Sequence, residues 1–216
     1  MQVAIDGPAG SGKSTVCKMI AEKYGLTYVD TGAMYRSIAW VAKNTGYDGL
    51  VEKTETIDFI FEENGKVIKI NFNGKITDLT NEIRTPEISA LVPNIAKDAE
   101  IRAVLVKKQQ SYAKDKDVIM EGRDIASVVL PNADLKVFLT ANDEERAKRR
   151  FKELEESNLK GKQTYEEVLK DIKKRDLVDS TRDTSPLTQT KDAILLDTTS
   201  LTLEEVTNKI GELIKK

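Results

Sequence analysis

The chain has 216 residues, of which 39% are hydrophobic and 32% are charged, and its formal net charge is −2. This length suffices for one domain with a buried core, and the charge excludes a broad electrostatic attraction to nucleic acid or to an anionic membrane. Because the sequence contains no histidine, catalysis by Ser-His-Asp or Cys-His groups and all histidine metal sites are excluded as well. Phosphoryl transfer depends mainly on positioning and charge neutralisation, so the remaining side chains serve this reaction class best.

The single cysteine, Cys17, cannot form an internal disulfide and is typical of a reducing compartment. The apolar run that begins at Gln2 breaks at Asp6-Gly7-Pro8, so we expect no secretion signal. No apolar stretch is long enough to span a membrane. We therefore expect a cytoplasmic protein, a monomer, with neither nucleic acid nor membrane as a partner.

The first predicted elements alternate between strand and helix. A buried strand is expected at 2–6, followed by a glycine-rich loop and an apolar-periodic helix that ends near Gly25. A second strand is expected at 27–30 and a second helix at 33–46. The segment from about 47 to 80 then changes character.

Within this segment, Asn64-Gly65 and Asn73-Gly74 each separate two β-rich runs. Such pairs are the strongest short-range signal of a β-hairpin, so we expect a small antiparallel sheet inserted into the chain. The later part alternates again, which predicts a parallel α/β sheet. Helices are expected at about 86–93, 99–114, 143–157 and 202–216, and a further helix is expected to begin at the capping box Thr164-x-x-Glu167. Strands are expected at 117–122, 135–141 and 193–197.

The loop 7-GPAGSGKS-14 matches the pattern G-x-x-x-x-G-K-[ST] between a predicted strand and a predicted helix. In such a loop the backbone N–H groups converge on phosphate oxygens, Lys13 reaches the β- and γ-phosphates, and Ser14 offers a hydroxyl to Mg²⁺. The motif therefore predicts a nucleoside triphosphate site with Mg²⁺ as cofactor. Its expected ATP-binding residues are Gly7, Pro8, Ala9, Gly10, Ser11, Gly12, Lys13, Ser14 and Thr15.

The motif does not say whether the γ-phosphate passes to a second substrate or to water. A guanine-reading GTPase should contain N-K-x-D, but the pair Asn208-Lys209 is followed by Ile210-Gly211. A motor ATPase should have an acid that closes an apolar strand, and Glu121 is a partial match that would reach Mg²⁺ through water. An NTP-hydrolysing switch therefore stays open as the less favoured alternative to a kinase.

A kinase needs a second site for its acceptor, built from loops at the carboxyl ends of parallel strands. In 30-DTGAMYRS-37, Thr31 stands at a helix N-terminus and Arg36 follows about a turn and a half later. Arg123 and Asp124 directly follow the buried strand at 117–122. The alternatives are a helix cap at Thr31, a surface charge at Arg36 and a plain turn at Arg123-Asp124.

Five of the nine arginines lie between Arg146 and Arg182. Arg146, Arg149 and Arg150 lie off the apolar stripe of their predicted helix, and pairing with neighbouring glutamates is the simple alternative for them. If the next helix continues far enough, its residues Arg175, Asp179 and Arg182 share one face, either as a solvated ion pair or as an anion site. Together these arginines predict a mobile lid that excludes water.

The motifs GPAGSGKST, DTGAMYR, EGRD and RDLVDSTRDTSPL occur in this order, with the antiparallel insert between the second and third. In this combination the whole chain closely resembles the bacterial cytidylate kinase family. The resemblance implies a three-layer P-loop α/β fold with a five-stranded parallel sheet, a small antiparallel NMP-binding insert and a short helical lid. It also implies transfer of the γ-phosphate of ATP to CMP or dCMP. The expected divisions are a core at about 1–35, 95–142 and 185–216, the insert at about 36–94 and the lid at about 143–184.

The resemblance further implies roles for particular residues. The CMP-binding residues would be Thr31, Arg36, Arg102, Arg123, Asp124, Arg175, Asp179 and Arg182. Arg36 and Arg102 would hold the acceptor phosphate, while Asp124 and Asp179 would meet base and ribose in an order that stays open. Lid arginines would neutralise the moving phosphoryl group, so the catalytic set is Lys13, Arg123, Arg149 and Arg150. UMP or dTMP stays open as an alternative acceptor.

Overall fold

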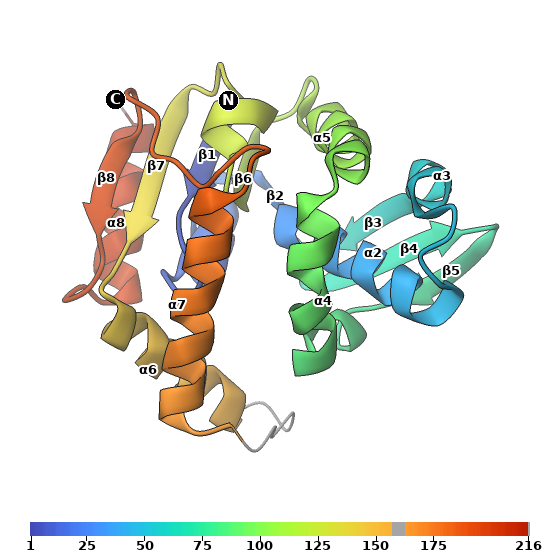
Figure 1. Cartoon of the computed structure of the whole chain (residues 1–216). Coiled ribbons are helices and arrows are strands. Elements are labelled where there is room, and N and C mark those ends of the chain that lie inside the picture. The colour runs from blue at the N-terminus through green and yellow to red at the C-terminus, as the bar shows by residue number, and fades with distance from the viewer. Residues whose placement is uncertain (157–162, 216) are drawn as a thin grey trace.

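A five-stranded parallel sheet forms the centre of the structure (Figure 1). The computed structural model describes residues 1–156 and 163–215 of the chain. The strand order is β2-β6-β1-β7-β8, and every neighbouring pair is parallel. The strands are β1 (Gln2–Asp6), β2 (Thr27–Asp30), β6 (Val118–Gly122), β7 (Leu135–Thr140) and β8 (Ile194–Asp197). The predicted α/β fold class is therefore confirmed.

Helices cover both faces of this sheet and make it the middle of three layers. Val3 and Ile5 of β1 pack against α1 (Lys13–Tyr24) and α8 (Leu203–Ile214) on one face. Ala4, on the other side of the same strand, belongs to the cluster that includes α5 (Ala99–Ala113) and the short π-helix η2 (Ile125–Val129). This alternation follows from the two-residue period of a strand. Burial of both faces explains why all five residues of β6 are buried.

The insert contains a second, antiparallel sheet with the order β3-β4-β5, as the two Asn-Gly pairs predict. Asn64 and Gly65 have φ of 53° and 75°, and Asn73 and Gly74 have φ of 54° and 76°. Asn73-Gly74 alone joins the paired Phe72 and Lys75, and positive φ at both residues is what this two-residue turn requires. The first connection is longer, 63–66, and Glu63 in it also has a positive φ of 49°. The strands are β3 (Asp58–Glu62), β4 (Val67–Phe72) and β5 (Lys75–Asp78), packed with α2 (Thr31–Thr45) in one apolar cluster.

Four short or interrupted helices differ from the prediction or extend it. The helix α3 (Leu50–Thr56) and the 3₁₀-helix η1 (Glu82–Arg84) have no predicted counterpart, because each is too short to show a clear period. The π-helix η2 was likewise not predicted. The predicted helix at 86–93 continues as α4 (Pro86–Lys97) through Pro93, because Ile95 and Ala96 beyond the proline are buried.

Two antiparallel helices follow β7 at the carboxyl end of the sheet, which is the lower end in Figure 1. They are α6 (Asp143–Glu156) and α7 (Tyr165–Thr181). Ala147 and Leu154 pack against Val168 and Ile172, and the predicted capping box at Thr164 is present in full. The end of the predicted helix at residue 157 lies outside the described residues. Figure 1 shows α7 rising from α6 in front of the central sheet, with the insert to its right.

Candidate active site

The glycine-rich loop joins β1 to α1 at the carboxyl end of the sheet. A Cβ atom added at Gly7 would lie 2.0 Å from the backbone oxygen of Leu139, and one added at Gly10 would lie 2.9 Å from that of Arg146. Gly10 and Gly12 also have φ of 74° and 89°. Glycine is thus required by close backbone approach and by left-handed backbone geometry, as in a loop whose amides surround an anion.

The Lys13 ammonium group is buried against this loop. Nζ donates hydrogen bonds to the backbone oxygens of Gly7 at 2.8 Å and Pro8 at 2.7 Å. Burial, with a smaller effect from the charge of Arg123, lowers the pKa of Lys13 to about 7. Because burial makes the charged form of this ammonium group unfavourable, an anion bound beside it would stabilise the charge.

Glu121 closes β6 beside the loop, and its carboxylate accepts hydrogen bonds from the hydroxyls of Tyr28 and Ser14. Burial and the nearby charge of Asp30 raise the pKa of Glu121. The hydroxyl of Ser14 and the carboxylate of Glu121 are oxygen donors of the kind that Mg²⁺ prefers. Within residues 1–156 and 163–215, no group of three or more acidic or cysteine side chains could hold a metal ion. A hydroxyl and a carboxylate side by side are suited to an ion that takes its remaining ligands from water and phosphate.

Four guanidinium groups lie close together next to this loop. Burial, together with the charges of Arg123, Arg36 and Arg150, lowers the pKa of Arg175 to about 9. Burial also lowers the pKa of Arg36, which has no ion-pair partner among the described residues. Cations gathered in this way repel one another unless an anion lies between them. The four arginines come from α2, from the turn after β6, and from α6 and α7, and their combined charge favours an anion at this place.

Asp179 lies inside this group. Its Oδ2 accepts a hydrogen bond from Arg123 Nε at 2.9 Å and lies 3.8 Å from Arg175 Nε. Burial alone would raise the pKa of Asp179, but Arg123 and Arg175 hold it below its usual value. The shared helical face contains only Arg175 and Asp179, because Arg182 follows the end of α7 and donates from Nε to the Ser185 backbone oxygen at 2.7 Å.

A second polar cluster lies around Arg102, which is 2% exposed. Its guanidinium forms an ion pair with Asp124 and lies 5.6 Å from the centre of the Tyr35 ring. Among the described residues, three buried polar atoms here have no hydrogen-bond partner: the Tyr35 hydroxyl, Arg102 Nε and Arg182 Nη2. Buried polar groups are normally paired, so these atoms indicate a site for a polar ligand.

Thr31 does not cap the helix α2, which was the alternative considered for it above. The side chain of Asp30 caps α2 by accepting a hydrogen bond from the Ala33 amide at 2.9 Å. Thr31 is the first residue of the helix, and its hydroxyl donates to the backbone oxygen of Glu121 at 2.6 Å. It therefore joins the start of α2 to the end of β6.

The cytidylate kinase family model matches residues 3–216 of the chain. The chain belongs to this family. It is 46% identical over 218 residues to the cytidylate kinase of Clostridium tetani, covering 99% of this chain and 93% of the relative. It is 47% identical over 221 residues to the cytidylate kinase of Caldanaerobacter subterraneus, covering 100% of this chain and 95% of the relative. The resemblance seen in the sequence motifs is confirmed.

Solved structures of lower identity agree with the fold. A shikimate kinase from Bacteroides thetaiotaomicron has a TM-score of 0.53 at 12% identity, covering 100% of this chain and 99% of that one. An uncharacterised protein from Eubacterium ventriosum has a TM-score of 0.58 at 13% identity, with the same coverage. The P-loop kinase fold of this cytidylate kinase family member therefore also occurs in chains that share little of its sequence.

The two lid arginines predicted to be catalytic face different parts of the site. Arg149 donates to the Thr198 hydroxyl at 2.9 Å and to the Thr198 backbone oxygen at 2.6 Å, and it pairs with Glu145 at 3.1 Å. A Cβ atom added at Gly12 would lie 3.9 Å from its Nη1, so this guanidinium adjoins the phosphate loop.

Arg150 lies on the side of the arginine cluster. It pairs with Glu153 at 3.0 Å, and its charge lowers the pKa of both Arg36 and Arg175. Arg149 and Arg150 thus both form the glutamate pairs that were the simple alternative. In addition, Arg149 adjoins the phosphate loop and Arg150 adjoins the arginine cluster.

Three further side chains of the site were not among the predicted residues. Tyr28 contacts Glu121, Tyr35 lies in the second polar cluster, and Arg146 contacts the phosphate loop. Tyr35 could have been found from its place in DTGAMYR. Arg146 was grouped with the lid arginines, but its contact with the phosphate loop and the position of Tyr28 depend on distant segments, for which the sequence carries no signal.

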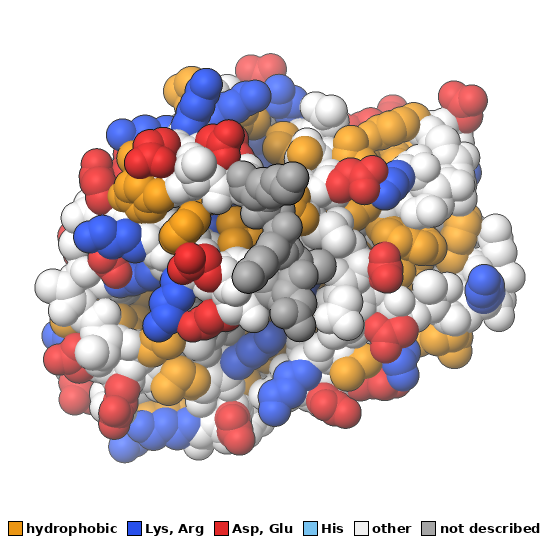
Figure 2. All heavy atoms as spheres, turned by 90° about the horizontal axis from the view of Figure 1, so that it is seen from below, with side chains coloured by type: hydrophobic (Ala, Val, Ile, Leu, Met, Phe, Trp, Pro, Cys, Tyr) orange, Lys and Arg blue, Asp and Glu red, His pale blue; other side chains and the backbone are white. Residues whose placement is uncertain are grey.

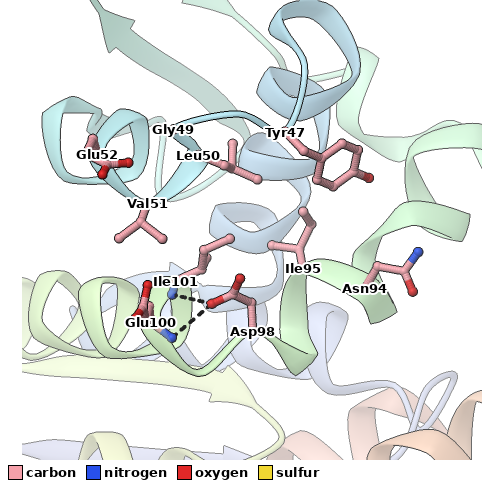
Figure 3. A pocket seen from close by; sticks show the side chains of 10 residues that line it. All are labelled: Tyr47, Gly49, Leu50, Val51, Glu52, Asn94, Ile95, Asp98, Glu100 and Ile101. Atoms are coloured by element: carbon pink, nitrogen blue, oxygen red, sulfur yellow. Dashed lines mark hydrogen bonds between the residues drawn. The ribbon is translucent and has the colours of Figure 1, made fainter.

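A separate cavity of about 400 Å³ lies between the loop before α3 and the junction of α4 and α5 (Figure 3). Its lining includes Tyr47, Leu50, Ile95 and Asp98, and Figure 3 shows Asp98 capping the start of α5. None of its ten lining residues is lysine or arginine. It therefore lacks the charge that a nucleotide phosphate needs.

Proposed function

We propose that this protein transfers the γ-phosphate of ATP to CMP or dCMP and forms CDP or dCDP. The proposal is carried by the arginine cluster, in which Asp179 Oδ2 lies 2.9 Å from Arg123 Nε and 3.8 Å from Arg175 Nε. The charges of both arginines reach Lys13 of the phosphate loop. A protein that only hydrolysed a nucleotide would have no use for a second buried anion site. Family membership and the relatives named cytidylate kinase support the same acceptor.

Residues 7–15 would bind ATP, with Lys13 leaving the carbonyls of Gly7 and Pro8 to reach the phosphates. Ser14 and Glu121 would hold Mg²⁺, which neutralises charge on the β- and γ-phosphates when it is bound. Arg149 adjoins the loop, and this position supports a contact with the donor nucleotide.

Arg36, Arg123 and Arg175 would hold the acceptor phosphate, and Thr31 would lie beside it. An acceptor phosphate oxygen is already an anionic nucleophile, so the reaction needs no general base. Arg150, whose charge reaches Arg175, would neutralise charge on the moving phosphoryl group.

The second polar cluster would read the base. Cytosine presents an amino donor next to a carbonyl acceptor, and the Asp124–Arg102 pair offers an acceptor next to a donor. This pairing favours a base contact for Arg102 over the phosphate contact expected from the sequence. Asp179, which lies among Arg123 and Arg175 on the phosphate side, would then meet the ribose, with Arg182 between the two groups.

The proposed divisions of the chain follow from these roles. The insert at about 36–94 would close on the acceptor, the lid at about 143–184 would cover both phosphates, and the remaining segments form the core. Closure of a lid excludes the water that competes with CMP as acceptor.

Among residues 1–156 and 163–215, none of the helices has the length and apolar character needed to cross a bilayer. The space-filling view from below shows Lys, Arg, Asp and Glu side chains interspersed over the described surface of that face (Figure 2). We infer a cytoplasmic monomer that acts on free nucleotides and not on nucleic acid.

Coupled measurement of ADP release with ATP and each nucleoside monophosphate in turn tests this proposal. We expect strong stimulation by CMP and dCMP. Stronger stimulation by UMP or dTMP would show a different acceptor, and equal turnover without any acceptor would overturn the kinase assignment.

A further inference from the structure

Arg146 is a buried arginine of α6 that contacts three separate parts of the molecule. It is 3% exposed. Its Nε donates to the Ala141 backbone oxygen at 3.0 Å, and its Nη1 donates to the Ala9 backbone oxygen at 2.9 Å. Its Nη2 forms ion pairs with Asp143 at 2.5 Å and Asp176 at 2.6 Å. One guanidinium therefore connects the end of β7, the phosphate loop and α7.

The contact with Ala9 matters because of how a phosphate loop is built. When its amides point at an anion, its carbonyls point away and need donors of their own. Lys13 holds the carbonyls of Gly7 and Pro8, but it must leave them to reach a phosphate. The guanidinium of Arg146 is buried and occupied by its contacts with Ala141, Ala9 and two aspartates, so it can keep its bond to Ala9 when Lys13 moves. The backbone of Arg146 also packs against Gly10.

The contact with Asp176 extends this support to the acceptor side. Asp176 directly follows Arg175 on α7 and lies within one helical turn of Asp179, and both of these belong to the arginine cluster. The carboxylate of Asp176 is 22% exposed, so its ion pair with Arg146 is partly shielded from water. One shared guanidinium thus joins α7 to the loop, in addition to the apolar packing of α7 on α6.

We propose that Arg146 is a positioning residue that holds the phosphate loop and α7 at a fixed separation, so that the acceptor-side arginines face the donor phosphate. This inference rests on the proposed phosphoryl transfer. Arg146 acts through Ala9 and Asp176 and does not contact the substrates. Small errors of position at reacting groups are costly in rate, which is why such a support contributes to catalysis.

Two variants separate the two ends of this connection. Arg146→Lys keeps the charge but has a single short ammonium group, which cannot span Ala9 and Asp176 together. Asp176→Asn keeps the contact between Arg146 and Ala9 and removes the charge that holds α7. Lys148→Met, at an exposed position of the same helix, is the matched control. Each variant is compared with the wild-type protein by thermal unfolding, by calorimetric binding of ADP without acceptor, and by steady-state kinetics with CMP.

We expect Arg146→Lys to weaken ADP binding and to lower kcat with CMP, each by roughly tenfold. Asp176→Asn should leave ADP binding within about twofold and lower kcat/KM for CMP by roughly tenfold. Lys148→Met should match the wild type. The proposal is overturned if Asp176→Asn leaves kcat/KM for CMP unchanged, or if it weakens ADP binding as strongly as Arg146→Lys does. Should Arg146→Lys fail to fold, Asp176→Asn alone decides. If the wild type shows no turnover with CMP, the proposed function fails, whereas the ADP measurements still test the support of the loop.

Discussion

The hydroxyl of Tyr28 donates a hydrogen bond to the carboxylate of Glu121, so the edge strand β2 holds the acid that closes β6. The same tyrosine is in contact with the first hairpin of the insert. Its backbone amide donates to Asn64 Oδ1 at 3.1 Å, and the ring packs against Gly65. Through one residue, the insert is therefore in physical contact with a proposed Mg²⁺ ligand.

Tyr28→Phe removes the hydroxyl and keeps the packing of the ring. Glu121 then loses a partner that orients it, and groups that orient metal ligands typically affect metal affinity by tenfold or more. We expect the Mg²⁺ concentration that gives half-maximal activity to rise by roughly tenfold. A Mg²⁺ titration at saturating ATP and CMP measures this change, and an unchanged titration curve would show that Tyr28 has no part in holding Glu121.

The two Asn-Gly hairpins provide a matched pair for the contact with Tyr28. Gly65 and Gly74 have φ of 75° and 76°, but a Cβ added at Gly65 would lie 2.4 Å from the Tyr28 ring, whereas one at Gly74 meets nothing within 4 Å. Gly74→Ala should cost about 1 kcal/mol of unfolding free energy from backbone strain alone. Gly65→Ala should cost about 1–3 kcal/mol more, because the ring must move. Urea unfolding of both variants measures the difference. Equal losses of unfolding free energy would mean that the hairpin at Gly65 is not in tight contact with the Tyr28 ring.

Asp6 makes the stability of the fold depend on pH. Its carboxylate accepts hydrogen bonds from the Ile125 and Ala126 amides at 2.9 and 2.8 Å, and burial raises its pKa from 3.8 to about 6. Since the folded state binds the proton more tightly than the unfolded state, this contribution to stability is complete below pH 3.8 and is lost as the pH rises through 6. It amounts to at most about 3 kcal/mol, because one pKa unit corresponds to about 1.4 kcal/mol.

Urea unfolding of the wild type and of Asp6→Asn between pH 4 and 7 tests this dependence. As the pH rises, the unfolding free energy of the wild type should fall relative to that of Asp6→Asn, because asparagine does not titrate. A constant difference over this range would show that Asp6 titrates normally in the folded protein.

Arg182→Ala should impair the use of CMP far more than the binding of ATP. Arg182 lies between the two polar groups of the proposed acceptor site, and its Nη2 is a buried donor without a partner among the described residues. We expect kcat/KM for CMP to fall roughly a hundredfold, with KM for ATP within about threefold of the wild type. Lys174→Ala, at an exposed position on α7, is the control and should keep both parameters. The reverse pattern, with ATP affected more than CMP, would mean that Arg182 belongs to the donor site.

Local signals predicted most of the elements correctly. The strand of β1, the loop 7–15 and the helix α1 follow one another in a short stretch, and glycine geometry specifies the turn. The hairpins at Asn64-Gly65 and Asn73-Gly74 are specified by the positive φ values that these residues tolerate. Short elements such as α3 and η2 were missed because they form through packing against the rest of the fold, which leaves too little periodicity to read.

The sequence by itself determined the reaction class and the family, and it predicted the donor site. A phosphate loop is formed by nine neighbouring residues, and the absence of histidine removes competing chemistry. Only the tertiary structure decided which side chains share a surface. It gathered Arg36, Arg123, Arg150 and Arg175 from four elements, and it separated Arg182 from the face of α7. It also placed Arg146 between Ala9 and Asp176, which are 167 residues apart in the chain (176 − 9). Contacts of this kind depend on how the strands and helices pack, and no single stretch of sequence encodes them.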